Sequence, residues 1–128
     1  MSKHTTVKKK FLANSERPSA LRPLPYDKGF HFYTAMGNYT GETATNLVNF
    51  AAKLEVIGVE SVNFHFKRSD FQKWIRDIVG DVKLAEKIDH IELELTGEKL
   101  RKELLGTLQA HISELKIAFS HQIRKHEE

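Results

Sequence analysis

The sequence predicts an α+β fold that is mostly α, with a short N-terminal β-hairpin packed on a four- to five-helix bundle and a long C-terminal helix. Residues 29–41 alternate aromatic and polar side chains and then supply turn residues, and residues 45–95 carry apolar side chains at helical spacing. From Glu98 to about Lys125, no proline interrupts a pattern rich in Leu, Lys and Glu. With 128 residues, 40% of them apolar, the chain can build one core.

The first 28 residues differ in composition from the rest. They hold seven Lys and Arg residues against two acids, and all three prolines of the chain, Pro18, Pro23 and Pro25. Residues 29–128 hold 13 basic and 15 acidic residues, so the positive charge is concentrated at the start. Because proline opposes regular structure and polar residues cannot build a core, we expect residues 1–28 to form a flexible basic arm and residues 29–128 a single compact domain.

The hairpin is expected at the start of that domain. Residues 29–34 are rich in aromatic side chains, and Gly37, Asn38 and Gly41 are residues that turns require. We predict a strand followed by a hairpin that closes through Tyr39 and Thr40. A two-stranded ribbon is marginal in water, so this hairpin must pack on helices or pair with another chain.

Two helices are expected next. Thr45 can cap a helix whose apolar residues recur at helical spacing, with Gly58 as a left-handed stop. The apolar positions of that helix are Leu47, Phe50, Ala51 and Leu54. Residues 59–67 are ambiguous, because Val62, Phe64 and Phe66 alternate as in a strand while Val62 and Phe66 are also one helical turn apart. A short helix is preferred.

The remaining helices have clear start and stop signals. Ser69 to Gln72 form a capping box before a helical stripe that ends at Gly80, and Asp81 can cap a further helix. The stripes are Phe71, Trp74, Ile75 and Ile78 in the first helix and Leu84, Ile88, Ile91 and Leu95 in the second. Thr96 and Gly97 mark a break before the long terminal helix, whose one internal weak point is Gly106.

Residues 29–41 and 64–85 resemble a known family. The most specific motif is Asp70-Phe71-x-x-Trp74-Ile75, followed by Gly80-Asp81 and Leu84-Ala85. This pattern is similar to the uncharacterised prokaryotic, often archaeal, domain of unknown function DUF5752 over residues 29–95. The resemblance implies a compact, helix-rich module that occurs alone or joined to other modules, which suits an adaptor better than an enzyme. It implies no activity, ligand or catalytic residue.

The candidate catalytic and metal-binding residues all have structural explanations. The chain has no cysteine, and its seven histidines show none of the spacings of metal sites. His31 and His65 flank the expected core and are interpreted as structural, and the other histidines as surface residues. Asp70 and Asp81 fit helix starts, Trp74 fits the core, and no glycine-rich phosphate motif occurs. We therefore expect no enzymatic activity, cofactor, metal or small-molecule substrate, and a cytoplasmic protein without a membrane span.

The basic arm is the best candidate for a binding site. We expect Lys8, Lys9, Lys10, Arg17 and Arg22 to bind nucleic-acid phosphates, and RNA or a ribosomal subunit rather than a chosen DNA sequence. A merely solubilising tail and a weak anchor to anionic lipid remain alternatives. The alternative function is that of a protein–protein adaptor or regulatory module with no role in nucleic-acid binding.

A homodimer is expected as well. The terminal helix carries Leu105, Leu108, Ile112, Leu115 and Phe119 at alternating three- and four-residue spacing, as in a coiled coil. The hairpin adds Phe30 and Phe32 as a second candidate surface. Because the heptad pattern is short, packing of the terminal helix within its own domain remains an open alternative.

Overall fold

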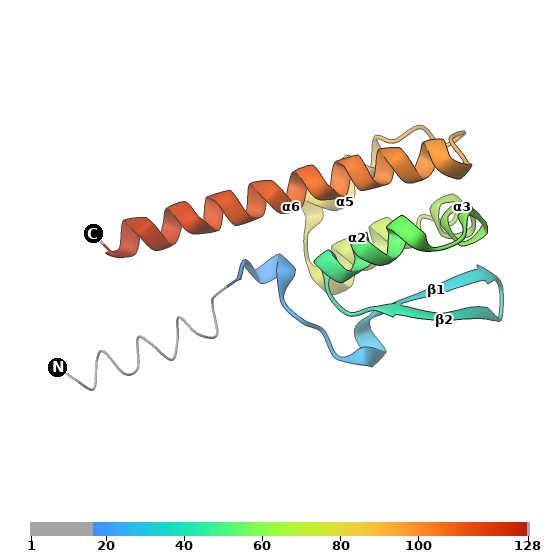
Figure 1. Cartoon of the computed structure of the whole chain (residues 1–128), viewed down its shortest axis with the longest axis horizontal. Coiled ribbons are helices and arrows are strands. Elements are labelled where there is room, and N and C mark those ends of the chain that lie inside the picture. Colours follow the sequence, from blue (N-terminus) through green and yellow to red (C-terminus); the bar gives the residue numbers. More distant parts are fainter. Residues whose placement is uncertain (1–16, 128) are drawn as a thin grey trace.

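The computed structural model describes residues 17–127, with side chains up to Gln122 (Figure 1). Two 3-10 turns, η1 (Ser19–Leu21) and η2 (Tyr26–Lys28), precede the strands β1 (Phe30–Ala35) and β2 (Asn38–Ala44). The helices follow as α2 (Leu47–Val56), α3 (Val59–Lys67), α4 (Asp70–Trp74), the π-helix η3 (Ile75–Val79), α5 (Val82–Asp89) and α6 (Gly97–Glu127). The predicted α+β, mostly α fold with a hairpin and a long last helix is confirmed.

The elements are arranged in three layers. The hairpin forms one outer layer and α6 the other, and α2 and α3 lie between them (Figure 1). The helix α3 packs on β1, α2 packs on β2, and both helices contact α6 on their other side. The hairpin therefore gains stability from helices of its own chain, the first of the two possibilities that its small size left open.

The core is built around aromatic rings from strand β1 and three helices. Phe32 stacks on Phe50 with ring centroids 5.7 Å apart, and Phe50 lies 5.1 Å from the ring of Trp74. Trp74 is buried as predicted, and its indole N–H donates to the carbonyl of Lys28 at 2.9 Å. Phe30 and Phe32 both point into this core, because they occupy the inward face of β1.

The second half of the expected arm packs on the domain. Leu21 is buried in the core, and the backbone N–H of Leu24 donates to the carbonyl of Thr45 at 2.8 Å. Arg22 donates to the carbonyls of Ile78 and Val79 at 2.9 and 2.7 Å. The expected domain boundary at residue 28 is therefore too late, since residues 17–28 supply core area and hydrogen bonds to the helices.

The caps around α2 differ from the sequence expectation. Asn46, not Thr45, caps the helix, since its side-chain oxygen accepts from the N–H of Asn49 at 2.7 Å. Gly58 has a φ of −59° and is no left-handed stop. The carbonyls of Leu54 and Ile57 are instead satisfied by Arg101 of α6, at 2.7 Å each. The short helix preferred for residues 59–67 is confirmed as α3.

The capping box predicted at Ser69 is wrong. Ser69 has a φ of +61°, whereas a capping side chain needs extended backbone, and it makes no capping hydrogen bond. The helix beyond Trp74 widens into the π-helix η3, in which the N–H groups of Gly80 and Asp81 both donate to the carbonyl of Ile75 at 2.9 Å. Asp81 caps α5 as predicted, with its carboxylate accepting from the N–H of Leu84 at 3.0 Å.

The helix α5 is shorter than its apolar pattern suggested. It ends at Asp89, because His90 and Ile91 donate to the carbonyls three residues earlier and so close the last turn tightly. Ile91 and Leu95 are half-buried in the segment that connects α5 to α6. The long terminal helix is confirmed as α6.

Candidate functional site

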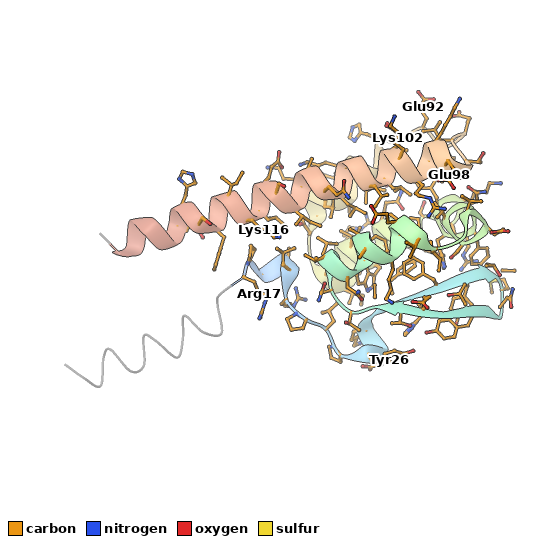
Figure 2. The ribbon with its side chains drawn as sticks, viewed as in Figure 1. Arg17, Tyr26, Glu92, Glu98, Lys102 and Lys116 are labelled. Carbon is orange, nitrogen blue, oxygen red and sulfur yellow. The ribbon has the colours of Figure 1, made fainter. Side chains whose placement is uncertain are left out.

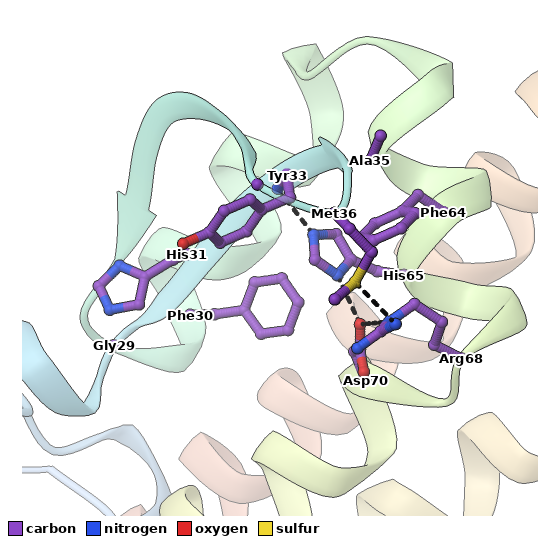
Figure 3. Close-up of a pocket in the computed structure, with 11 residues that line it drawn as sticks. Gly29, Phe30, His31, Tyr33, Ala35, Met36, Phe64, His65, Arg68 and Asp70 are labelled. Atoms are coloured by element: carbon purple, nitrogen blue, oxygen red, sulfur yellow. Dashed lines mark hydrogen bonds and ion pairs between the residues drawn. The ribbon is translucent and has the colours of Figure 1, made fainter.

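An open cleft of about 410 Å³ lies between the hairpin and α3 (Figure 3). Strand β1 contributes residues from Phe30 to Ala35, the turn contributes Met36 and Gly37, and α3 contributes Phe64, His65 and Arg68. Gly37 has a φ of +77°, which a glycine adopts without strain, and this allows the tight turn that bounds the cleft. The cleft thus joins two segments that lie more than 25 residues apart in the sequence.

His65 lies between the cleft and the core with both ring nitrogens bonded (Figure 3). The backbone N–H of Tyr33 donates to Nε2 at 2.8 Å, so Nε2 carries no proton. The proton is then on Nδ1, which donates to Asp70 Oδ2 at 2.8 Å. Burial lowers the pKa of His65 below its ordinary 6.5, although Asp70 opposes the shift. His65 is therefore neutral, and its two hydrogen bonds agree with the interpretation of His65 as a structural residue.

Arg68 and Asp70 form an ion pair at one end of the cleft. Arg68 Nε donates to Asp70 Oδ2 at 2.9 Å, and the guanidinium carbon lies 5.1 Å from the centre of the Phe64 ring. Arg68 Nη1 also approaches the sulfur of Met36 at 3.3 Å. Ser69, between the two charged residues, has the left-handed backbone described above. No sequence pattern pointed to this pair beyond the assignment of Asp70 to a helix start.

The predicted phosphate-binding residues have different surroundings. Arg17 is exposed at the start of the described chain, whereas Arg22 is occupied by the carbonyls of Ser19, Ile78 and Val79. Lys8, Lys9 and Lys10 lie outside the described residues. Arg22 is consequently a structural residue and is removed from the candidate phosphate site.

The predicted dimer surfaces are largely used inside the chain. Phe30 and Phe32 are core residues, and Leu108 and Ile112 face the core from α6. Their side chains cannot also form the contact surface of a dimer, so their assignment to one is corrected. Leu105, Leu115 and Phe119 are half-buried. The first half of this heptad pattern therefore packs within its own domain, which is the alternative that the short pattern left open.

A second histidine is buried in a polar network that the sequence did not reveal. His111 was expected on a solvated surface, but Lys87 Nζ donates to its Nδ1 at 3.0 Å and its Nε2 donates to Asp81 Oδ2 at 2.8 Å. Lys87 also pairs with Glu114 at 2.9 Å. This network joins α5 to α6, and it leaves neither nitrogen of His111 free for chemistry.

Within residues 17–127 we find no helix with the length and apolar character that a membrane span requires. Nor do the described side chains bring three or more histidines, aspartates or glutamates together in a group that could hold a metal ion.

The match to known families is longer than the motifs alone suggested. The family of unknown function DUF5752 matches residues 9–109, so the match includes η1, η2 and most of the packed part of α6 as well as residues 29–95. No curated protein and no solved structure matches the chain. Because the family covers well over half of the sequence, the chain belongs to the family of unknown function DUF5752.

Proposed function

We propose that this protein is a non-enzymatic nucleic-acid-associated protein whose N-terminal cations hold the phosphates of RNA or of a ribosomal subunit. The charge distribution carries the proposal. Residues 1–17 contain Lys3, Lys8, Lys9, Lys10 and Arg17 with Glu16 as their one acid, whereas residues 29–128 have a small excess of acids. Clustered lysines bind phosphates through counterion release and need no preformed groove.

The fold supports a cationic end of the molecule. Arg17 lies with Leu115 and Phe119 at one cleft beside α6, and Figure 2 shows it on the same side as the exposed Lys116. Glu92 and Glu98 lie at the N-terminal end of α6, together with Lys102 (Figure 2). The described chain therefore begins on the side of Lys116 and away from these acids (Figure 2).

RNA is preferred to a chosen DNA sequence. The sequence carries no helix-turn-helix or zinc-finger signature, so nothing favours the reading of base edges in a DNA groove. Phosphate contacts position a protein without specifying a sequence, and this suits a single strand or a ribosomal surface.

The proposal includes a homodimer formed through the C-terminal half of α6. Leu115 and Phe119 are half-buried there, and Ile117 is 60% exposed. A dimer would present two cationic segments to one polyanion, which raises avidity. Sedimentation equilibrium at tens of micromolar tests this part, and a monomer mass at every concentration would remove it.

The exposed Val56, Leu93 and Ile117 favour the alternative, a protein–protein adaptor with no nucleic-acid role.

The deciding experiment measures binding of a labelled single-stranded RNA as a function of salt. With about four phosphates neutralised, the log–log slope should be roughly −3, and replacing Lys8, Lys9 and Lys10 by alanine should flatten it by about 2. The matched control replaces three exposed lysines of the body, Lys67, Lys73 and Lys83, and should leave affinity and slope close to those of the natural chain.

Three outcomes would contradict the proposal. Equal effects of the two triple variants would show a nonspecific charge effect, and no effect of either would make the N-terminal lysines a solubilising tail. Equal affinity for DNA of the same sequence would remove the preference for RNA.

A further inference from the structure

The cleft between the hairpin and α3 has the size and lining of a small-molecule site. Its volume of about 410 Å³ lies within the usual range for such sites, roughly 300 to 1,000 Å³. Phe30, Tyr33 and Phe64 give it an aromatic lining. Met36 stands at its edge with 76% of its surface exposed, and an apolar ligand would cover part of that surface.

The charged end of the cleft offers both a donor and an acceptor. Arg68 uses Nε for Asp70 and Nη1 for Met36, and Asp70 uses Oδ2 for Arg68 and His65. Among the described residues, Arg68 Nη2 and Asp70 Oδ1 have no hydrogen-bond partner. Both side chains are accessible, with exposed fractions of 47% and 20%. A carboxylate could therefore bind the arginine while an ammonium group binds the aspartate.

The net charge of this end decides between ligand classes. Arg68 and Asp70 compensate each other, and the two hydrogen bonds of His65 leave its ring neutral. A purely anionic ligand would meet Asp70, and a purely cationic ligand would meet Arg68. A zwitterion places each of its charges on the opposite charge of the protein and gains from both.

The backbone between the two charged residues has an unusual conformation. Ser69 is the one non-glycine residue with positive φ among residues 17–127, and it separates Arg68 from Asp70. A residue with a side chain adopts this conformation at an energetic cost, and such residues concentrate at functional sites. Here the left-handed turn ends α3 and brings the two charges to the same end of the cleft.

We propose that the cleft binds a free hydrophobic α-amino acid, independently of the nucleic-acid role proposed above. The side chain of the ligand lies on Phe30, Tyr33 and Phe64, its carboxylate accepts from Arg68, and its ammonium group donates to Asp70. Both nitrogens of His65 are already bonded, so His65 does not act on the ligand, and the proposal is one of binding alone. The protein is then a sensor or carrier of an amino acid.

The test is calorimetric titration of the full chain with L-phenylalanine and with L-leucine. We expect saturable binding of at least one of them, and binding about tenfold or more weaker for 3-phenylpropionate and for 2-phenylethylamine, each of which lacks one charge. Arg68→Met should weaken binding by a similar factor. The matched control is Arg76→Met, which removes an exposed arginine that also lies beside an aspartate, Asp77, but outside the cleft.

A second variant fills the site without touching its charges. Ala35 is exposed and lines the cleft, so Ala35→Trp should abolish binding while the thermal unfolding midpoint stays near that of the natural chain. The proposal is overturned if neither amino acid binds at up to about 10 mM. It is also overturned if the single-charge analogues bind equally well, or if Arg68→Met or Ala35→Trp binds like the natural chain.

Discussion

A single histidine links the hairpin to the helices. His65 receives the N–H of Tyr33 from β1 and donates to Asp70 at the start of α4, so one side chain joins three elements. The Tyr33 N–H would otherwise be a free donor on the edge of β1 that faces away from β2. The position of His65 in the apolar pattern of α3 indicates burial. Its hydrogen-bond partners, however, lie 32 positions before and five positions after it in the sequence. Those partners could not be predicted without the fold.

The stability of the protein should fall as the pH drops through the range in which His65 titrates. Burial lowers the folded-state pKa of His65 below 6.5, while the unfolded chain keeps the ordinary value. The unfolded state therefore binds the proton first, so the contribution of neutral His65 is complete above the unfolded pKa and is lost as the pH falls through the folded pKa. A proton on Nε2 would also displace the Tyr33 N–H. Urea unfolding between pH 5 and 8 measures this dependence.

The variant His65→Gln should reduce the slope of stability against pH in that window, whatever its effect on stability at neutral pH. His90→Gln is the control, because His90 is exposed and makes one hydrogen bond to the carbonyl of Glu86. If His65→Gln keeps the full slope of the natural chain, another group is responsible for the pH dependence.

At the scale of elements, the periodicity of apolar residues predicted which helices and strands exist. Their boundaries depended on side chains that are distant in the sequence. The end of α2 is the clearest case. The pattern offered Gly58 as a local stop, but the free carbonyls of α2 are satisfied by Arg101, more than 40 residues later in the sequence. The widening of η3 likewise depends on the carbonyl to which the N–H groups of Gly80 and Asp81 donate. The spacing of apolar residues carries no information about that choice.

Arg22 satisfies the last carbonyls of η3 in the same way that Arg101 satisfies those at the end of α2. The last carbonyls of a helix lack partners within it, and Arg22 donates to those of Ile78 and Val79. Arg22→Met keeps most of the apolar stem and removes these charged hydrogen bonds, so it should lower the free energy of unfolding by about 1 to 3 kcal/mol. Chemical denaturation followed by Trp74 fluorescence gives the value.

The control for this prediction is Arg17→Met, five residues earlier and exposed, which should change stability by less than about 0.5 kcal/mol. The two variants also separate structure from binding, since Arg17 remains in the proposed phosphate site and Arg22 does not. Equal losses of stability from both would show that Arg22 is no cap.

At the scale of the whole molecule, composition predicted one domain but placed its start too late. Three prolines and several charges make residues 17–28 look like part of the arm. Yet Leu21 packs in the core beside α2, Leu24 bonds to the segment between β2 and α2, and Arg22 bonds to η3. The cleft escaped prediction for a related reason. Its two halves, residues 29–37 and 64–70, are separate in sequence, and they meet because the hairpin folds onto α3.

Two deletions should place the true boundary of the folded domain. A chain that starts at residue 17 should unfold with the same midpoint as the full chain, because it keeps every described contact of η1 and η2. A chain that starts at residue 29 loses buried Leu21, the cap from Arg22 and the carbonyl of Lys28 that accepts from Trp74. The loss of one buried leucine and of charged hydrogen bonds should cost at least about 3 kcal/mol.

Urea unfolding monitored by the fluorescence of Trp74 measures both deletions. The emission of the shorter chain should also shift before unfolding begins, because its indole N–H has lost the Lys28 carbonyl. Equal stability of the two deleted chains would show that residues 17–28 add nothing to the fold, and the domain would then begin at residue 29 as composition suggested. A loss of stability already on removal of residues 1–16 would instead place further stabilising contacts before Arg17.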